Sequence, residues 1–345
     1  MPALSVLVVC PDGDPGMLGS FGRAFRALGH RVQHWNLGAA IDRHVKFDRL
    51  GRLLTSYFPF DPWLVGANRD LIEETMAFEP DLLLFAGQQS VRAGALAQIK
   101  VCRPRVKVVM TWPDTLLNLT DRAIACLPMC DLVASYSQTA IAQLERFGAR
   151  TVSWVPFGVD TELFPHDIDI TPDDLRRLGS DVAFVGNHRP AREKAVLRLL
   201  DAGLDVKVWG SSDWTRRAAN RARLRTYFQG GPLLGASLVK ALRCAKVSLN
   251  VIDPTNYPAA NMRFFEQFAC GVASLSSACP EMEPIFPDGD CVSYYQEHNL
   301  AEKARELVED RQLREKLARN GHLVAMASHT YADRARAILQ SVGIA

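Results

Sequence analysis

Two opposite charges, Arg263 and Glu266, stand one helical turn apart in the segment 261–271. Asn261 is a good N-cap, apolar residues follow it at helical spacing, and Gly271 ends the pattern, so we expect a helix. The pair can be an ordinary ion pair on a solvated face, which contributes roughly a few tenths of a kcal/mol. Near a helix N-terminus the same two groups can instead bind the ribose hydroxyls and phosphates of a nucleotide. Spacing alone leaves both interpretations open.

A second group of charges follows a short apolar run. Gly186 and Asn187 form the turn after that run, and Arg189, Arg192 and Lys194 lie at the start of the next predicted helix. Cations at a helix N-terminus oppose the helix dipole, so they are unfavourable there unless an anion is bound. The pattern therefore favours contact between a diphosphate and at least one of Arg189 and Arg192.

Three glycines, Gly16, Gly19 and Gly22, follow the first predicted strand at intervals of three residues. They do not form the Gly-x-Gly-x-x-Gly pattern, and the second predicted strand ends without an acidic residue. The sequence therefore argues against a nicotinamide-dependent enzyme. Two interpretations of the glycines stay open. They allow a tight turn with close helix packing, or they let backbone amides approach a phosphate or a sugar.

Three carboxylates also follow predicted strands. Asp114 comes after a strand and a Trp-Pro pair, and it either caps a turn or helix or serves an acceptor substrate as a general base or polar contact. Glu281 and Glu283 come after a later strand. Each can reach a binding cleft or lie on the surface, and we expect the surface for one of the two.

Short apolar runs alternate with segments of helical periodicity in both halves of the chain, which is typical of parallel sheets covered by helices. We expect strands at 4–9, 31–35, 81–86, 106–111, 131–135, 151–155, 181–185, 204–209, 247–252, 272–276 and 291–295. We expect helices at 17–28, 68–78, from Ser90, and at 121–129, 138–147, 191–202, 236–244 and 261–270, with a long helical segment from Asn299 that breaks at Asn320-Gly321.

This organisation predicts an α/β protein with two doubly wound halves, which bind ligands in a crevice at the carboxyl ends of the strands. The loops at 210–213 and 253–261 belong to that edge. The length of 345 residues suits two domains. A proline-rich and acidic segment at 157–180 is the predicted linker. We expect domains at 1–160 and 175–329 and a final helix at 330–345.

Composition narrows the classes of partner. The formal net charge of +2 implies no bulk attraction to nucleic acid or membrane surfaces. The arginine cluster at 216–225 lacks interleaved aromatics and is interpreted as a solvated face, so we expect no nucleic-acid partner. The basic run at 42–52, which includes Arg49 and Arg52, is a solvated face or a lining for an anionic acceptor.

The eight cysteines lack metal-ligand spacing, which predicts buried, reduced thiols in a cytoplasmic protein without a bound metal. The first apolar run is too short for a signal peptide, and no apolar run approaches the length that crosses a membrane.

A family resemblance rests on the segment from Asn261 to Glu266, which reads Asn-Met-Arg-Phe-Phe-Glu and is followed by Ala269-Cys-Gly271. It resembles the C-terminal signature of GT-B glycosyltransferases, and is most similar to the CgeB-like (spore maturation protein) branch. Further similar segments are 155–164, Phe184-Val-Gly-Asn187 followed by Arg192, Val208-Trp-Gly210 followed by Trp214, and His329-Thr-Tyr331 with Arg334. The first half shares only its organisation and the glycine loop with the family.

The resemblance implies two facing Rossmann-like domains, with a nucleotide-sugar donor held mainly by the C-terminal one. It also implies that the helix at 330–345 returns to the first domain. Glu266 would accept hydrogen bonds from the ribose. The amides around Ala260 and Asn261, together with Arg263 or Arg189, would face the diphosphate. In this family cations and a helix dipole neutralise the diphosphate, so no metal and no cofactor are expected.

The resemblance leaves the stereochemistry open. Retaining families carry a second glutamate eight residues before the ribose glutamate, and here Pro258 occupies that position. The base would lie near Gly210, and Gly16, Gly19 and Glu281 would line the acceptor side of the cleft.

We therefore expect a cytoplasmic glycosyltransferase of the hexosyltransferase type. It would transfer a sugar from a nucleotide-diphosphate sugar, with a UDP-sugar favoured, to an acceptor glycan, protein or small molecule. The alternatives are a sugar-nucleotide epimerase of the same fold and a degenerate GT-B protein that acts as a binding or scaffold partner.

Overall fold

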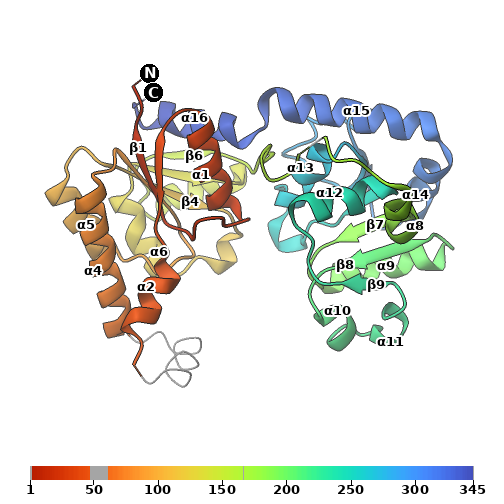
Figure 1. The fold of residues 1–345 in the computed structure, drawn as a ribbon, viewed down its shortest axis with the longest axis horizontal. Coiled ribbons are helices and arrows are strands. Elements are labelled where there is room, and N and C mark those ends of the chain that lie inside the picture. The colour runs from red at the N-terminus through yellow and green to blue at the C-terminus, as the bar shows by residue number, and fades with distance from the viewer. Residues whose placement is uncertain (1, 47–60, 166, 345) are drawn as a thin grey trace. The chain divides into compact units, whose positions relative to one another are not determined.

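The computed structural model describes residues 2–46, 61–165 and 167–344. Arg49 and Arg52 of the predicted basic run therefore lie outside the described residues. The chain divides into two compact units (Figure 1). Unit 1 comprises the residues up to Pro156 together with those from Ala332 onward, and unit 2 comprises Phe157–Tyr331.

Unit 1 is built on a six-stranded sheet in the order β2-β1-β3-β4-β5-β6, in which every pairing is parallel. Its strands are β1 (Ser5–Val8), β2 (Arg31–His34), β3 (Leu82–Ala86), β4 (Lys107–Trp112), β5 (Leu132–Ser135) and β6 (Val152–Trp154). All five residues of β3 are buried, as expected for a strand covered on both faces.

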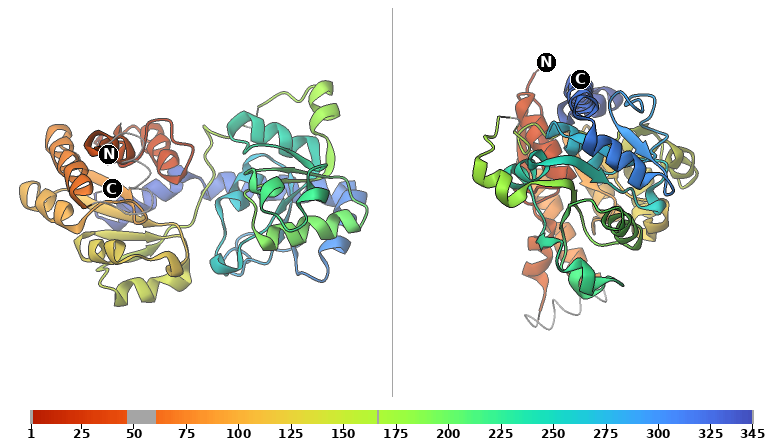
Figure 2. Two further views of the ribbon diagram at one scale, coloured as in Figure 1. Left: turned by 90° about the horizontal axis from the view of Figure 1, so that it is seen from below. Right: turned by 90° about the vertical axis from the view of Figure 1, so that its right-hand side faces the viewer.

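The helices of unit 1 connect these strands and cover the sheet (Figure 2). They are α1 (Met17–Ala27), α2 (Leu37–His44), α4 (Asp61–Phe78), α5 (Ala93–Cys102), α6 (Asp121–Cys126) and α7 (Ile141–Arg146). The last helix, α16 (Tyr331–Ser341), joins unit 1 from the far end of the chain. Arg334 Nε on α16 donates a hydrogen bond to the carbonyl of Pro156 at 3.0 Å.

Unit 2 repeats the architecture with a parallel sheet in the order β12-β11-β10-β7-β8-β9. Its strands are β7 (Ser180–Val185), β8 (Val206–Trp209), β9 (Phe228–Gly230), β10 (Ala245–Asn250), β11 (Ala273–Ser277) and β12 (Ser293–Tyr295). Its helices are α8 (Pro172–Leu178), α9 (Pro190–Asp201), α10 (Asp213–Arg216), α11 (Arg221–Leu224), α12 (Gly235–Cys244), α13 (Met262–Ala269), α14 (Leu300–Glu309) and α15 (Arg311–Ser328). The predicted α/β class with two parallel sheets is confirmed.

The apolar face of α13 anchors this helix in unit 2. Phe264, Phe265 and Phe268 are fully buried, and the ring of Phe268 stacks on Phe286 with centroids 4.6 Å apart. Burial of each such ring stabilises the fold by roughly 1.5–3 kcal/mol. The opposite, polar side of α13 therefore has a fixed position at the edge of the sheet.

The predicted helix break at Asn320-Gly321 is wrong, because α15 runs through both residues and the break lies at Asp310. A Cβ atom at position 321 would lie 2.6 Å from Cδ1 of Phe268. Gly321 is therefore a site of close packing between α15 and α13. The local sequence pattern instead indicated a helix break, because glycine is unfavourable inside a helix.

Three further expectations differ from the structure. The predicted linker at 157–180 contains helix α8, whose Asp174 pairs with Lys240 of α12 at 2.9 Å. Helix α5 begins at Ala93 with Arg92 as its N-cap, and not at Ser90. The arginine cluster at 216–225 is exposed as expected, but it spans parts of two short helices, and β9 after it was not predicted.

Seven of the eight cysteines are buried and Cys102 is exposed, in agreement with the predicted buried thiols. Burial raises the pKa of the Cys10, Cys270 and Cys279 thiols to about 12. None of the helices in the described part of the chain has the length and apolar character needed to cross a membrane.

Candidate functional site

The candidate site lies in unit 2 at the carboxyl ends of its strands. Because all pairings in this sheet are parallel, the segments that follow β7, β8 and β10 leave the sheet at the same edge. The segment after β7 leads into α9, and the segment after β10 leads into α13. The sheet therefore brings together the two helix starts that carry the predicted site residues.

Asn261 fixes the start of α13. Its side-chain oxygen accepts a hydrogen bond from the amide of Phe264 at 3.0 Å, which is an N-cap of the expected kind. Its Nδ2 donates to Oδ1 of Asn250 at 3.0 Å, and Asn250 Nδ2 donates to Ser276 Oγ at 3.1 Å. Asn250 is fully buried, so a chain of side-chain hydrogen bonds holds α13 over the ends of β10 and β11.

Arg263 and Glu266 form a largely buried ion pair. Nη1 of Arg263 lies 2.6 Å from Oε2 of Glu266, with 19% and 9% of the two side chains exposed. Nε of Arg263 donates to the carbonyl of Val185, the last residue of β7, at 3.1 Å. The pair does not lie on a solvated helix face. It connects α13 to β7, and removal of either partner would leave an uncompensated buried charge.

Arg192 is a half-buried cation beside this pair. Its Nη1 donates to the carbonyl of Asn187 at 2.9 Å, while its Nε is buried and has no hydrogen-bond acceptor among residues 2–46, 61–165 and 167–344. Burial lowers the pKa of Arg192. Asp253 opposes this shift, whereas the nearby charges of Arg189 and Arg263 add to it. An anion that accepts from Nε would satisfy this donor.

Arg189 completes the cluster. It is the N-cap residue of α9, and its Nε lies 3.9 Å from Oδ2 of Asp253. Three guanidinium groups, from Arg189, Arg192 and Arg263, thus share two carboxylates, from Asp253 and Glu266. Among these five side chains the positive charges exceed the negative ones by one, and the carboxylate of Glu193 in the first turn of α9 is engaged by His188 and two backbone amides, so a bound anion is favoured at the arginines.

Gly186 and Gly210 place the ends of β7 and β8 close together. A Cβ atom at position 210 would lie 2.1 Å from the carbonyl oxygen of Gly186, so no other residue fits without movement of the backbone. The same carbonyl accepts a hydrogen bond from Nε1 of Trp214 at 2.8 Å. Both predicted glycines therefore shape the edge of the site.

Glu193 holds the loop after β7 in place. Its carboxylate is 2.7 Å from Nε2 of His188 and accepts from the amides of Ala219 and Asn220. Burial raises the pKa of Glu193, but these hydrogen bonds outweigh burial and keep the pKa below its ordinary value. The ring of His188 meets Trp214 edge-on at 5.2 Å. The sequence indicated no role for Glu193, because its partners Ala219 and Asn220 are distant along the chain.

The other predicted residues of unit 2 occupy the loops around α13. Ala260 is buried directly before the N-cap. Glu281 is half-buried, and its backbone amide donates to the carbonyl of Pro258 at 3.4 Å, whereas Glu283 is exposed. Glu283 is thus the surface carboxylate of the two. The sequence placed Asp253 at the edge of the sheet, but the approach of Asp253 to Arg189 was not predicted.

Asp114 and the glycine loop belong to unit 1. The carboxylate of Asp114 accepts hydrogen bonds from Gln88 Nε2, Asn118 Nδ2 and the amide of Thr115, each at 2.8 Å. These contacts fit the turn-stabilising interpretation, and the role of general base stays a prediction. No group of three or more metal-ligating side chains occurs in the described parts of either unit.

The glycine loop shows close packing. A Cβ atom at Gly19 would lie 1.9 Å from the carbonyl oxygen of Asp14, and one at Gly22 would lie 2.3 Å from Cε1 of His34. Gly16 is the N-cap residue of α1. The packing interpretation of Gly19 and Gly22 therefore has a structural basis, and a contact with a phosphate or sugar stays a prediction.

Comparison with known families finds that part of the chain is similar to glycosyltransferases. A family model described as glycosyl transferase-like matches residues 189–340, which include Arg189, Arg192 and the whole of α13. This match bears out the prediction of a glycosyltransferase for that part of the chain. The CgeB-like branch stays a prediction. A search of curated proteins gives no significant match.

Solved structures of similar fold cover nearly the whole chain. Sucrose-phosphate synthase from Thermosynechococcus elongatus aligns over 98% of both chains with a TM-score of 0.69 and 15% identity. HepE from Anabaena, solved with UDP and glucose, aligns over 99% of both chains with a TM-score of 0.64 and 16% identity. A proposed UDP-N-acetylglucosamine 2-epimerase from Listeria monocytogenes aligns over 99% of this chain and 96% of its own, with a TM-score of 0.56 and 13% identity. These likenesses confirm the GT-B fold.

Proposed function

We propose that this GT-B-fold chain is a glycosyltransferase that moves a sugar from a nucleotide-diphosphate sugar to an acceptor glycan, protein or small molecule. The observation that carries the proposal is the convergence of Arg189, Arg192 and Arg263 beside Asp253 and Glu266 at one edge of the unit 2 sheet. A site with excess positive charge and a buried donor without an acceptor suits a diphosphate.

In this proposal Arg192 and Arg189 bind the diphosphate, together with the first amides of α9. Negative charge builds on the diphosphate as the bond to the sugar breaks. Cations placed there beforehand stabilise the transition state more than the bound substrate, which is the requirement for catalysis. The chain supplies these charges from its own side chains, so we propose a transfer that needs no bound metal.

Glu266 is proposed as the acceptor for the ribose hydroxyls. Its Oε2 is engaged by Arg263, which leaves the other carboxylate oxygen for the nucleotide. A hydrogen bond to a charged group contributes about 1.5–3 kcal/mol. The packing of α13 through its buried phenylalanines and the cap at Asn261 hold the carboxylate in place before the ligand arrives.

UDP-sugars are the favoured donors. HepE, which shares the fold, was solved with UDP-glucose, and sucrose-phosphate synthase and AviGT4 are further relatives by fold. A sugar-nucleotide epimerase is the second candidate, because the Listeria monocytogenes protein shares the fold as well. The acceptor, the CgeB-like branch and a cytoplasmic location remain parts of the proposal that the sequence suggests.

The proposal is tested by incubation with UDP-glucose, UDP-N-acetylglucosamine and GDP-mannose in the absence of an acceptor. Slow release of the nucleoside diphosphate with free sugar is expected from a glycosyltransferase. An isomerised nucleotide sugar without nucleotide release would establish the epimerase instead. If no nucleotide raises the melting temperature and no donor is consumed, the site assignment is wrong and the scaffold alternative holds.

A further inference from the structure

Three buried polar side chains lie where helix α13 of unit 2 packs on its sheet. Gln267 belongs to α13, Ser248 to β10 and Ser274 to β11. At most 1% of each residue is exposed. Ser248 and Ser274 are paired across the parallel strands β10 and β11, so their side chains point to the same face of the sheet. The group is therefore closed to solvent and belongs to the interior of unit 2.

One hydrogen bond is formed within this group. Oγ of Ser274 donates to Oε1 of Gln267. Nε2 of Gln267 and Oγ of Ser248 are buried and have no hydrogen-bond partner in the described part of the chain. Burial of polar atoms without partners costs stability, so such atoms in a native fold need a reason other than packing. An apolar side chain at position 267 would avoid that cost.

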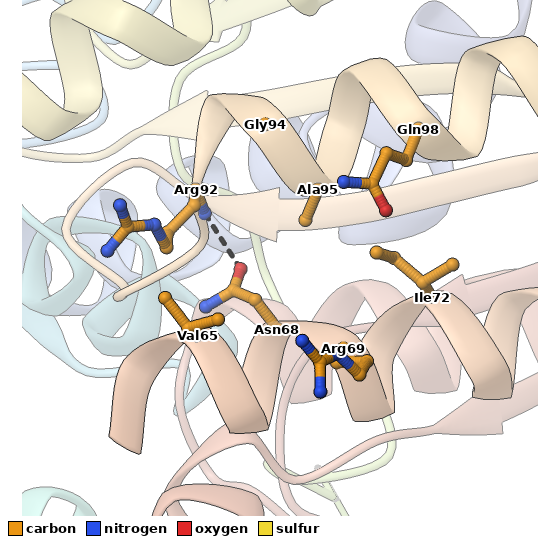
Figure 3. Close-up of a pocket in the computed structure, with 8 residues that line it drawn as sticks. All are labelled: Val65, Asn68, Arg69, Ile72, Arg92, Gly94, Ala95 and Gln98. Carbon is orange, nitrogen blue, oxygen red and sulfur yellow. Dashed lines mark hydrogen bonds between the residues drawn. The ribbon is translucent and has the colours of Figure 1, made fainter. Parts of the chain in front are cut away.

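Asn68 of unit 1 shows what a buried amide does when its polar atoms are paired (Figure 3). Its Nδ2 donates to the carbonyls of Leu64 and Ser90 at 2.8 and 2.9 Å, and its Oδ1 accepts from the amide of Arg92 at 2.8 Å, the hydrogen bond drawn in Figure 3. Asn68 thereby fixes the start of α5 on α4. The hydrogen bond of Gln267 fixes α13 on β11 in the same way, but at one point.

The place of Gln267 on α13 links this hydrogen bond to the proposed donor site. Gln267 directly follows Glu266, and consecutive residues of an α-helix point about 100° apart around its axis. A rotation of α13 that turned Glu266 away from a ligand would also break the hydrogen bond to Ser274. The buried phenylalanines control this rotation less strictly, because apolar contacts are non-directional and tolerate small shifts. A buried polar contact forms in one arrangement and selects it.

Asn261 and Arg263 hold the same helix at other points. The N-cap at Asn261 holds its first turn, while Arg263 forms an ion pair with Glu266 and donates to the carbonyl of Val185. Gln267 holds the last turn of α13 against β11. The helix is thus attached to the sheet on both sides of Glu266.

We propose that Gln267 is a positioning residue, which keeps Glu266 directed at the ribose of the nucleotide through its hydrogen bond to Ser274. The inference rests on the proposed function, because it requires that Glu266 binds the ribose. Its readout is the ratio of the affinities for UDP and 2′-deoxy-UDP, measured by calorimetry on the full chain. This ratio reports the ribose contact, because it compares two ligands on the same protein.

The two serines provide a variant and its matched control. Ser274→Ala removes the partner of Gln267, whereas Ser248→Ala removes a hydroxyl without a partner in the described part of the chain. The preference for UDP over 2′-deoxy-UDP should fall by roughly threefold or more in Ser274→Ala, as expected when a charged hydrogen bond is weakened but not removed. It should stay at the wild-type value in Ser248→Ala.

The double variant Gln267→Met/Ser274→Ala separates positioning from stability. It replaces both hydrogen-bonding partners by apolar groups, so its melting temperature should stay close to the wild-type value. Its ribose preference should be as low as that of Ser274→Ala, because both substitutions remove the same hydrogen bond. A wild-type preference in the folded double variant would overturn the proposal. An equal loss of preference in Ser248→Ala and Ser274→Ala would also overturn it.

A failure of the proposed function gives a different result, because it is seen in the wild-type protein. If the wild type does not bind UDP, the donor site is wrong and the role of Gln267 is wrong with it. If the wild type binds UDP and 2′-deoxy-UDP equally, Glu266 does not contact the ribose and Gln267 has no such contact to support. Circular dichroism confirms that each variant is folded.

Discussion

Nη1 of Arg263 lies 2.6 Å from Oε2 of Glu266, while Nε of the same guanidinium donates to the carbonyl of Val185. Arg263 thus has one partner on its own helix and one at the end of β7. We infer that Arg263 is a positioning residue that orients Glu266. Nη1 of Arg263 is buried and, like Nε of Arg192, makes no hydrogen bond in the described part of the chain, so a phosphate contact from Arg263 stays a prediction beside those from Arg189 and Arg192.

The first prediction concerns Glu266 and the ribose. Glu266→Gln keeps the shape of the side chain but removes its charge, so UDP affinity should fall by roughly 10-fold or more, as expected for the loss of a charge-assisted hydrogen bond of about 1.5–3 kcal/mol. The wild-type protein should also bind UDP more tightly than 2′-deoxy-UDP, and the variant should lose much of that preference. Calorimetry with both nucleotides measures the effect.

The matched control for this experiment is Glu283→Gln, because Glu283 is an exposed carboxylate in the same unit. Its affinity for UDP should equal that of the wild type. Equal discrimination between UDP and 2′-deoxy-UDP by wild type and Glu266→Gln would show that Glu266 does not contact the ribose.

The second prediction concerns Arg192 and the diphosphate. Arg192→Ala removes the half-buried guanidinium whose buried Nε lacks an acceptor in the described part of the chain. UDP affinity should fall by roughly 10-fold or more, whereas uridine, which has no phosphate, should bind equally well to variant and wild type. Arg216→Ala, at an exposed arginine of unit 2, is the control. A similar loss for uridine and UDP would mean that the substitution disturbs the site as a whole.

Local signals predicted α13 well, because a cap, a spacing and a terminator all lie within the short segment 261–271. Gly271 does end the helix with a positive φ of 64°. The contacts that complete the site could not be predicted from local sequence patterns. Asp253 contacts Arg189, and Glu193 contacts Asn220, although the partners are distant along the chain. Their residue types are common on protein surfaces, so only the folded sheet shows which of them meet.

Gly321 shows that prediction from local sequence has the same limit for the fold. A glycine after an asparagine reads locally as a helix end, yet here the missing side chain makes room for Phe268. Its significance lies in a tertiary contact, and sequence periodicity carries no information about such contacts. The alternation of strands and helices, in contrast, follows from patterns of burial, and most elements were predicted, although α2, α8 and β9 were not.

The third prediction contrasts two helical glycines. Replacement of glycine by alanine inside a helix stabilises it by about 0.8–1 kcal/mol when space is available. Gly94 is the second residue of α5, so Gly94→Ala should raise the melting temperature by less than this interior value implies, and its Cβ meets no atom within 4 Å. Gly321→Ala should lower it, because a Cβ there would lie 2.6 Å from Cδ1 of Phe268, and such overpacking costs about 1–3 kcal/mol. Changes of the same sign in thermal unfolding would contradict the close packing of α15 on α13 at Gly321.

The fourth prediction concerns pH and Asp174, at the start of α8. A hydrogen bond from Lys240 and two from Thr171 lower the pKa of Asp174 to about 2, below the value near 3.8 expected in the unfolded chain. A carboxylate whose pKa is lower in the folded state contributes stability above its unfolded pKa, and this contribution is lost as the pH falls through the folded value. Unfolding followed by circular dichroism should thus show that stability decreases between pH 5 and about pH 2. Part of this decrease is the lost contribution of the Asp174 carboxylate.

The variant Lys240→Met isolates the contribution of the Asp174–Lys240 pair to the pH dependence, because it removes the ammonium group and keeps much of the apolar stem. Stability should decrease less steeply with falling pH in this variant than in the wild type, and the difference between the two proteins should shrink toward pH 2. A difference that stays constant from pH 5 to pH 2 would show that the Asp174–Lys240 pair does not control the titration. In that case the capping hydrogen bonds from Thr171 alone would account for the low pKa.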